Sequence, residues 1–423
     1  MTEQDDEREY DQEYDYVIVG AGVAAASAAK AIRADDPDGT IAVFGADPDG
    51  PYYRPDLSKT LWLDPKAVPG AGWLLDPNET DVTLLTDTTV TSLDPGDHTL
   101  TTSTGATVAY SQLLLATGAA PNRLGSESPA DAQAPGSERI IYYRTVETYR
   151  RLRRLAGPGS HVIVVGGGYI GGEIASALAQ NDIHVTLVMP TELIQQAMFP
   201  EDLAAAVTKT FVDRGVDVVG STRVDTIVPD AEGGTVTVTS VDGKTFTGDA
   251  VVLGLGVSPN DSLAERAGIT VDDGIVVDQR LETNTTDVYA AGDVANYYDS
   301  LLGRRRAEHV DQAENSGRIA GRNMVAARRA TERHVYDYTP IFWSDLFDFG
   351  YEAVGDLDAR LRTVENLKDD FTQGTVYYLD ANDRVRGVLL WNVWDSTDKA
   401  KELIRRTEAE HLGDAELARA IEF

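Results

Sequence analysis

The sequence predicts an α/β fold in which one strand–loop–helix unit occurs twice and a smaller strand-rich region follows. The first copy is DYVIVGAGVAA, Asp15–Ala25, and the second is HVIVVGGGYIGGE, His161–Glu173. In each, a β-branched run suited to a buried strand breaks into glycines, and a helix of small residues comes next. From Phe342 onward the chain changes to aromatic-rich strands and closes with a charged helix. These observations predict two Rossmann-like units and an α+β C-terminal domain.

Small residues in both loops follow the spacing G-x-G-x-x-G/A. They are Gly20, Gly22 and Ala25 in the first copy, and Gly166, Gly168 and Gly171 in the second. The first glycine allows a tight turn, the second lets backbone N–H groups approach a pyrophosphate, and the third small residue lets helix and strand pack closely. The helix N-terminus adds free N–H groups and its positive dipole end. One such loop also fits an ordinary glycine-rich turn, but two distant copies predict two dinucleotides with electron transfer between them.

The first unit continues with a helix over Ala24–Ile32 and a strand over Thr40–Phe44. An acidic residue after this second strand holds the ribose in nucleotide-binding units of this kind. Asp47 lies 27 positions after Gly20, near the expected spacing. The surrounding ADPDG also suits a plain turn, so both interpretations of Asp47 stay open.

A proline-rich segment, Pro51–Trp62, follows and is not expected in the core. It carries two cations, Arg54 and Lys59, that are candidates to face a flavin and a phosphate. The next buried strand, Leu113–Ala120, ends in a turn of small residues, and Pro121–Gly136 reads as a polar linker. Short strands are expected before it, at Asp81–Leu85, Val90–Leu93, Thr99–Thr102 and Thr107–Val108.

The second unit lacks the acidic residue at its strand end. A helix is expected over Tyr143–Leu155, and after the loop the second strand is Val185–Val188, followed by Met189 and Pro190. Glu192 is the nearest carboxylate, and this turn carries no Arg or Lys to pair with a 2′-phosphate. The sequence therefore favours NADH over NADPH.

Later segments complete the pattern. The run TNTTDVYAAGDVA contains a strand that ends at Asp293, whose carboxylate suits a polyol or the N-cap of the next segment. A helix over Gly171–Gln180 follows the second loop. The other helices expected are Glu308–Ala326 and Lys399–Glu410, and the other strands expected are Asp249–Gly256, Gly374–Leu379 and Val385–Trp391.

Composition narrows the class further. The chain has 423 residues and a formal net charge of −32, which disfavours nucleic-acid binding and is typical of a protein from a high-salt cytoplasm, although a plainly acidic protein has the same signature. The Arg150–Arg154 and Arg304–Arg306 clusters are expected to make local ion pairs or helix surface. The absence of Cys excludes a redox-active C-x-x-C, six scattered His predict no metal site, and no run is long enough to span a membrane.

Several long motifs resemble the FAD-dependent pyridine-nucleotide reductases. Besides the two loops, these are PYYRPDLSK, LLLATGAAP and VYAAGDVA, which resemble the ferredoxin and rubredoxin reductase branch. RRRAEHVDQAENSGRIAGRNM, FWSDLFDFGYEAVGDLD and GVLLWNVWD bring the chain closer to the branch of apoptosis-inducing factor. The acidic composition of 1–14 predicts a disordered tail. The resemblance implies an FAD-binding domain at 15–140 and 258–335, an NAD(H)-binding domain at 141–257, and a C-terminal domain at 336–423. Asp56 replaces the second Pro of the family's PPLSK, and this departure puts the path of that loop in question.

The resemblance also assigns roles to residues. Lys59 and Glu173 are expected to meet beside the flavin, where the lysine would stabilise reduced flavin, although the two would also fit a purely structural ion pair. Tyr169 and Trp343 are expected near the nicotinamide and in the flavin pocket, or as ordinary core aromatics. The other cofactor-binding candidates are Gly20, Gly22, Ala25, Asp47, Arg54, Ala116, Thr117, Gly118, Gly292, Asp293, Glu308 and His309, with Gly166, Gly168, Ile170, Gly171, Glu192 and Gly256.

The expected function is FAD-dependent NAD(P)H oxidation. Hydride passes from NADH to flavin N5, and electrons then reach an acceptor such as ferredoxin or rubredoxin. Two alternatives stay open: a reductase of quinones or other small molecules, and a redox-sensing protein that holds NADH and turns over slowly. A cytoplasmic monomer or homodimer is expected.

Overall fold

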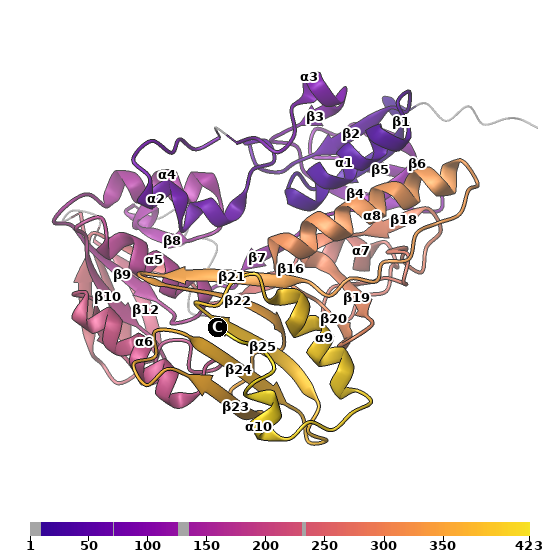
Figure 1. Ribbon diagram of the computed structural model, residues 1–423. Coiled ribbons are helices and arrows are strands. Elements are labelled where there is room, and N and C mark those ends of the chain that lie inside the picture. The colour runs from indigo at the N-terminus through magenta and orange to yellow at the C-terminus, as the bar shows by residue number, and fades with distance from the viewer. Residues whose placement is uncertain (1–9, 71, 126–134, 231–233) are drawn as a thin grey trace, which may run out of the picture. The chain divides into compact units, whose positions relative to one another are not determined.

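A computed structural model of the chain describes residues 10–70, 72–125, 135–230 and 234–423 (Figure 1). Its contacts form two compact units, each treated separately below. Unit 1 comprises Met1–Tyr53, Gly72–Ala119 and Pro259–Tyr338, and unit 2 comprises Arg54–Ala71, Ala120–Ser258 and Thr339–Phe423. The chain passes between them five times, after Tyr53, Ala71, Ala119, Ser258 and Tyr338, and the third and fourth passages fall within β7 (Ala119–Pro121) and β16 (Val257–Pro259).

Unit 1 is built on a seven-stranded sheet with the order β3-β2-β1-β6-β5-β4, and β18 pairs with β6. Its strands are β1 (Gln12–Val19), β2 (Ile41–Phe44), β3 (Thr83–Leu85), β4 (Val90–Asp94), β5 (Thr99–Thr102), β6 (Thr107–Leu115) and β18 (Val288–Ala290). The pairings among β1, β2, β3, β6 and β18 are parallel, whereas the pairings of β4 with β5 and of β5 with β6 are antiparallel. Every residue of β2 and β18 is buried, as expected for parallel strands that are covered on both faces.

Helices α1 (Val23–Asp35) and α8 (Val310–Arg328) pack against each other with backbones in close approach, and they lie side by side in Figure 1. The contact surface of α1 carries Ala24 and Ala28, and that of α8 carries Gly317 and Gly321. A Cβ on Gly317 would collide with the carbonyl oxygen of Ala24, and one on Gly321 with that of Ala28. Small residues at four-residue spacing on both helices therefore allow this crossing.

The rest of unit 1 is short. A small sheet contains β17 (Ile275–Val276), β19 (Ala295–Asp299) and β20 (Gly303–Arg305), and the remaining helical segments are α3 (Pro77–Thr80), α7 (Ser262–Arg266) and the 3₁₀ turn η4 (Gly292–Val294).

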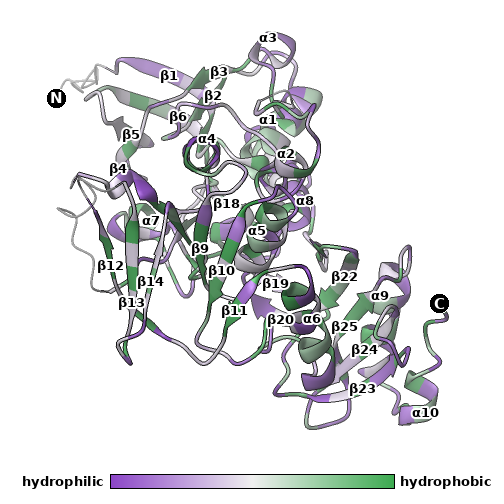
Figure 2. Ribbon diagram, turned by 90° about the vertical axis from the view of Figure 1, so that its left-hand side faces the viewer, coloured by the Kyte–Doolittle hydropathy of each residue, from purple (hydrophilic) through white to green (hydrophobic). Residues whose placement is uncertain are grey.

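Unit 2 contains a five-stranded parallel sheet with the order β11-β10-β9-β15-β8. Its strands are β8 (Ile140–Tyr142), β9 (His161–Val165), β10 (His184–Val188), β11 (Asp217–Val219) and β15 (Ala250–Leu253). The hydropathy colouring of Figure 2 shows β9 and β10 largely in hydrophobic green. An antiparallel sheet of β12 (Val224–Pro229), β13 (Val236–Ser240) and β14 (Thr245–Gly248) shares a core with it.

A second five-stranded sheet in unit 2 is wholly antiparallel, with the order β21-β22-β25-β24-β23. Its strands are β21 (Ile341–Leu346), β22 (Phe349–Gly355), β23 (Arg362–Leu367), β24 (Gly374–Leu379) and β25 (Val385–Trp391). The helical segments of unit 2 are η1 (Arg54–Leu57), α2 (Thr60–Leu63), η3 (Ser137–Arg139), α4 (Val146–Leu155), α5 (Tyr169–Ala179), α6 (Glu201–Asp213), α9 (Thr397–Thr407) and α10 (Asp414–Leu417).

The predicted α/β class is confirmed, and three details differ from expectation. β1 begins at Gln12, because Gln12–Tyr14 pair with β6 even though they belong to the acidic run. The strand expected at Thr107–Val108 and the start of the strand expected at Leu113–Ala120 belong to one strand, β6, which ends at Leu115. The proline-rich segment does contribute to a core, since Leu57 and Trp62 are buried. Residues 1–9 of the predicted tail and most of the predicted linker lie outside the described residues.

Candidate functional site

The first glycine loop connects β1 to α1 in unit 1. Gly20 has a φ of +112°, and a Cβ there would collide with the carbonyl oxygen of Ala116 at the end of β6. Gly22 caps α1 and offers no side-chain oxygen to its first N–H groups, while a Cβ on Gly22 would meet no atom within 4 Å. Ala25 is fully buried beneath the loop. The loop thus leaves free N–H groups facing an open approach, as a pyrophosphate requires, and these residues fit one half of a dinucleotide.

Two neighbouring segments of unit 1 border this loop. After β6, Ala116–Gly118 turns with a φ of +67° at Gly118, and Thr117 Oγ1 donates to the carbonyl oxygen of Asn260 at 2.7 Å. After β18, the N–H of Gly292 donates to Ser316 Oγ at 2.9 Å. Of the two interpretations of Asp293, the N-cap is not observed, because Asp293 lies within η4, whose N-cap is Ala291, and His309 occupies the N-cap position of α8.

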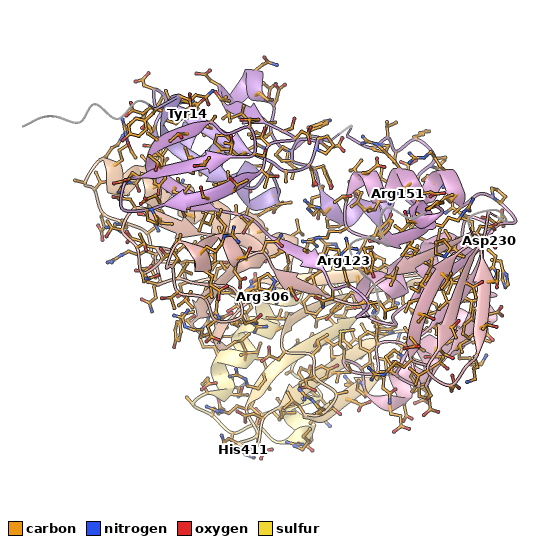
Figure 3. The ribbon with its side chains drawn as sticks, turned by 180° about the vertical axis from the view of Figure 1, so that it is seen from behind. Tyr14, Arg123, Arg151, Asp230, Arg306 and His411 are labelled. Atoms are coloured by element: carbon orange, nitrogen blue, oxygen red, sulfur yellow. The ribbon has the colours of Figure 1, made fainter. Side chains whose placement is uncertain are left out.

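Arg306 organises the segment between Asp293 and α8, and no motif in the sequence indicated this role. Its Nη1 donates to the carbonyl oxygen of Asp293 at 3.2 Å and to Glu308 Oε1 at 2.6 Å, and its Nε donates to Asp273 Oδ1 at 3.1 Å (Figure 3 labels Arg306). Burial alone would lower the pKa of this guanidinium, but the carboxylates of Glu308 and Asp273 raise it above the ordinary value. The expectation of local ion pairs at Arg304–Arg306 is met at this residue.

His309 is neutral at physiological pH. Burial lowers its pKa to about 4, and the Asp293 carboxylate only partly opposes this shift, although some of the ring stays accessible. The ring therefore acts as a neutral donor or acceptor at the start of α8.

Asp47 and Arg54 belong to different units. Asp47 is half-buried in the loop after β2 of unit 1, where its backbone carbonyl accepts from the N–H of Asp87 at 3.0 Å. Arg54 belongs to unit 2, where its Nη1 donates to the carbonyl oxygen of Arg144 at 3.0 Å. The acid that suits a ribose thus accompanies the first glycine loop, and the cation accompanies the second.

The second glycine loop, between β9 and α5 in unit 2, repeats the first. Gly166 has a φ of +111°, and a Cβ there would collide with the carbonyl oxygen of Gly254 after β15. A Cβ on Gly171 would collide with the carbonyl oxygen of Gly166, whereas one on Gly168, the cap of α5, would meet no atom within 4 Å. Gly256 completes the turn after β15 with a φ of +80°. This loop also fits a pyrophosphate, for the same reasons.

Glu173 forms the centre of a polar cluster within unit 2. Its Oε2 accepts from Ser58 Oγ at 2.5 Å and its Oε1 accepts from Ser344 Oγ at 2.6 Å, while Lys59 Nζ lies 3.1 Å from Oε1. The side chains of Lys59 and Glu173 are only 13% and 7% exposed. Lys59 also lies 3.2 Å from Asp345 Oδ2, on a carboxylate that is half exposed. The expected pairing of Lys59 with Glu173 is present, whereas its two serine partners carry no sequence signature.

Aromatic side chains lie beside this cluster. Tyr169 and Phe342 meet edge to face with ring centroids 5.5 Å apart, and Phe342 in turn meets Tyr351. Burial, together with the nearby Tyr169 and Glu173, raises the pKa of Tyr351 well above its usual range. Tyr351 therefore keeps its proton and donates to Gln195 Oε1 at 3.3 Å.

Gln195 is a residue that the sequence did not single out. It has a φ of +54°, and its N–H donates to the carbonyl oxygen of Gly167 in the glycine loop at 2.9 Å. Its Nε2 is buried and has no hydrogen-bond partner among the described residues. Ile170 is 40% exposed beside Tyr169, and Trp343 is half-buried on β21.

The strand end after β10 contains no cation. Met189 packs on Gly167, since a Cβ on that glycine would overlap the methionine side chain. Glu192 is exposed, and its N–H donates to Gln196 Oε1 at 3.0 Å. Gly220 of the adjoining loop lies against the backbone of Glu192, and Arg223 is the nearest cation along that loop.

Comparisons with known proteins agree with this geometry. The family model described as pyridine nucleotide-disulphide oxidoreductase matches residues 14–317. Apoptosis-inducing factor 1, mitochondrial, of Dictyostelium discoideum is 34% identical over 462 residues, covering 100% of this chain and 85% of that protein. The ferredoxin–NAD(+) reductase component of the anthranilate 1,2-dioxygenase system of Burkholderia cepacia is 34% identical over 397 residues, covering 92% of this chain and 93% of that protein.

Solved structures are similar over most of the chain. Putidaredoxin reductase, in its covalent complex with putidaredoxin, matches with a TM-score of 0.82 and 28% identity, covering 94% of this chain and 93% of that one. A ferredoxin reductase from Rhodopseudomonas palustris matches with a TM-score of 0.83 and 26% identity, covering 96% of this chain and 97% of that one. With a glycine loop for one dinucleotide in each unit and relatives of this kind, the chain belongs to the pyridine nucleotide-disulphide oxidoreductase family and is an FAD-dependent NAD(P)H oxidoreductase.

Proposed function

We propose that this chain oxidises NADH and delivers the electrons to a small electron-carrier protein such as a ferredoxin or rubredoxin. The observation that carries the proposal is the pair of glycine loops, one in each unit, each with an uncapped helix N-terminus and an open second glycine. FAD held by the first glycine loop of unit 1 would supply the hydride acceptor and the one-electron chemistry that such a carrier needs. The names of the relatives support the class of acceptor.

In this proposal the protein positions reactants instead of performing acid–base chemistry. The carboxylate of Glu173 is held by two serine hydroxyls, and it fixes the Lys59 ammonium in a largely water-excluded position. A fixed cation stabilises negative charge on reduced flavin better than a mobile one, because no reorganisation is needed during the reaction. Tyr169, at the start of α5, is assigned to the nicotinamide.

For the second cofactor we propose NADH over NADPH. The chain from Met189 to Pro200 has no Arg or Lys, and Glu192 would repel a 2′-phosphate. Since the chain has no Cys, its own side chains cannot carry out the disulphide chemistry in the family's description.

We also propose that the protein works in a high-salt cytoplasm, on the basis of its net charge of −32. Among the helices of the described chain, none has both the length and the hydropathy needed to cross a membrane.

The proposal is tested with two glycine variants. Gly22→Ala adds a methyl group where the structure is open, so we expect a folded protein with weaker FAD binding. Gly20→Ala is the matched control, because its methyl group collides with Ala116 and should destabilise unit 1 itself. Wild-type protein should be yellow and release FAD on denaturation. Colourless wild-type protein that FAD does not reconstitute would refute the proposal.

Steady-state oxidation of NADH against several acceptors then identifies the reaction. Rapid reduction of a carrier protein supports the proposal. Activity with quinones alone would indicate a small-molecule reductase, and slow reoxidation with every acceptor would indicate an NADH-binding sensor.

A further inference from the structure

Helix α4 of unit 2 carries a concentration of positive charge that contrasts with the rest of the chain. Between Arg144 and Leu155 the sequence RTVETYRRLRRL has five arginines and a single acid, Glu147, in a chain whose net charge is −32. The helix buries Val146, Tyr149 and Leu152, which lie three residues apart and face the core. Four of these arginines, Arg150, Arg151, Arg153 and Arg154, belong to the helix and occupy its remaining surface, where Figure 3 labels Arg151.

This surface is rigidly attached to the segment that carries Lys59. Arg153 lies over the ring of Trp62, with Cζ 4.6 Å from the centroid, and Tyr149 meets Trp62 edge to face at 5.5 Å. The Tyr149 hydroxyl donates to the carbonyl oxygen of Leu61 at 2.9 Å, and Trp62 Nε1 donates to the Tyr143 hydroxyl at 3.0 Å. Lys59 is the N-cap residue of α2, three positions before Trp62.

Exposed apolar side chains follow Trp62 along the chain. Leu63, at the end of α2, is 47% exposed, and Val68 is 62% exposed in the following loop. Protein interfaces combine apolar contacts and arginine with a polar rim, and a local charge opposite to the general field guides a partner to one place. Since the net charge of this chain is strongly negative, its general field repels an acidic partner, and a local arginine patch reduces that repulsion.

We propose that the arginine surface of α4, consisting of Arg151, Arg153 and Arg154 with Leu63 and Val68, is the docking site for an acidic one-electron carrier protein. The inference rests on the proposed function and names the surface on which its acceptor binds. The overall reaction is NADH plus two oxidised carriers giving NAD⁺, one proton and two reduced carriers. Two carriers must therefore bind in turn, so each reduced carrier has to dissociate before the next one docks.

The test uses neutralising variants on α4 and a matched pair elsewhere. Arg151→Gln with Arg154→Gln keeps good helix-forming residues, and Arg405→Gln with Arg419→Gln removes two exposed arginines from the C-terminal segment. The probe is an acidic [2Fe–2S] ferredoxin, assayed with NADH at low and high salt. We expect the ferredoxin KM of the α4 variant to rise roughly three- to tenfold at low salt, with the control pair near wild type and the difference shrinking in salt.

A variant of opposite sign excludes general damage. Glu147 lies 3.6 Å from Arg154 and is the acid on this surface, so Glu147→Gln should lower the ferredoxin KM. NADH–menadione activity, which needs no protein docking, should be unchanged in all variants.

Equal ferredoxin KM values in the α4 variant and wild type would overturn the docking proposal. Menadione reduction without ferredoxin reduction at any salt concentration would overturn it too, while leaving NADH oxidation intact. A change in oligomeric state without a change in ferredoxin KM would assign the surface to a second copy of this chain instead. Absence of activity with both acceptors would refute the proposed function itself.

Discussion

Replacing Lys59 by methionine tests both the stability and the chemistry assigned to the Glu173 cluster. The variant removes a cation from a pair with 3.1 Å between Nζ and Oε1, whose side chains are 13% and 7% exposed. At this separation the attraction is about 5 kcal/mol for an effective dielectric constant near 20. The net loss is smaller, because Ser58 and Ser344 still donate to the carboxylate. We expect unit 2 to lose about 3 kcal/mol, the lower end of the range for breaking a buried pair.

Asp345→Asn is the matched control for this variant. It removes the other carboxylate that contacts Lys59, but that carboxylate is half exposed, so we expect a loss of about 1 kcal/mol or less. Urea unfolding followed by tryptophan fluorescence reports mainly on unit 2, which contains Trp62, Trp343, Trp391 and Trp394.

The same Lys59→Met protein distinguishes a functional cation from a structural one. If the ammonium stabilises reduced flavin, FAD stays bound, bleaching by NADH slows, and the flavin potential falls by on the order of 30 mV for each 1.4 kcal/mol lost. A destabilised variant with wild-type potential and bleaching rate would refute the assigned role and leave Lys59 as a structural partner of Glu173. Equal destabilisation by Lys59→Met and Asp345→Asn would refute the burial argument.

Three further outcomes are expected. In stopped-flow experiments NADH should bleach the flavin faster than NADPH. Glu192→Arg should reduce the difference between the two bleaching rates, and Arg223→Gln should leave that difference unchanged. A wild-type preference for NADPH would contradict the assignment of the ribose site to the end of β10. Thermal unfolding should shift upward between 0.1 M and 1 M potassium chloride, because the Debye length falls from about 10 Å to about 3 Å, and a downward shift would contradict the high-salt proposal. His309 has a folded pKa of about 4, below an unfolded value near 6.5. Its contribution to the free energy of unfolding is therefore complete above about pH 6.5 and is lost as the pH falls toward 4. In His309→Gln this part of the pH dependence of stability should disappear, and an unchanged pH profile would contradict the lowered pKa.

The sequence predicted the parts of this molecule that have a local cause. Both glycine loops, the helices after them and the pairing of Lys59 with Glu173 followed from spacing or from the resemblance. It failed at β6, because Thr107–Val108 and the strand beginning at Leu113 were expected to be separate and are continuous. Gln112 is buried there, and its Nε2 donates to Asp287 at 2.7 Å, a contact across 175 positions that no local pattern reveals.

The same limitation applies to the candidate site. Ser58 and Ser344 are common residues that meet Glu173 only because three distant segments converge on it. Arg306 looked like one of three similar arginines, and only the backbone path places its guanidinium between Asp273, Glu308 and the carbonyl oxygen of Asp293.

The close crossing of α1 and α8 has a consequence for how the chain folds during synthesis. The two helices are separated by about 275 residues, and the collision of even one added methyl group shows that neither can accept a substitute partner easily. At a translation rate of about 5–20 residues per second, the first glycine loop waits roughly 15–55 s for α8 to leave the ribosome. Strands β8 to β15 are complete well before that time. The second nucleotide-binding sheet is therefore able to form while the alanine face of α1 still lacks its partner helix.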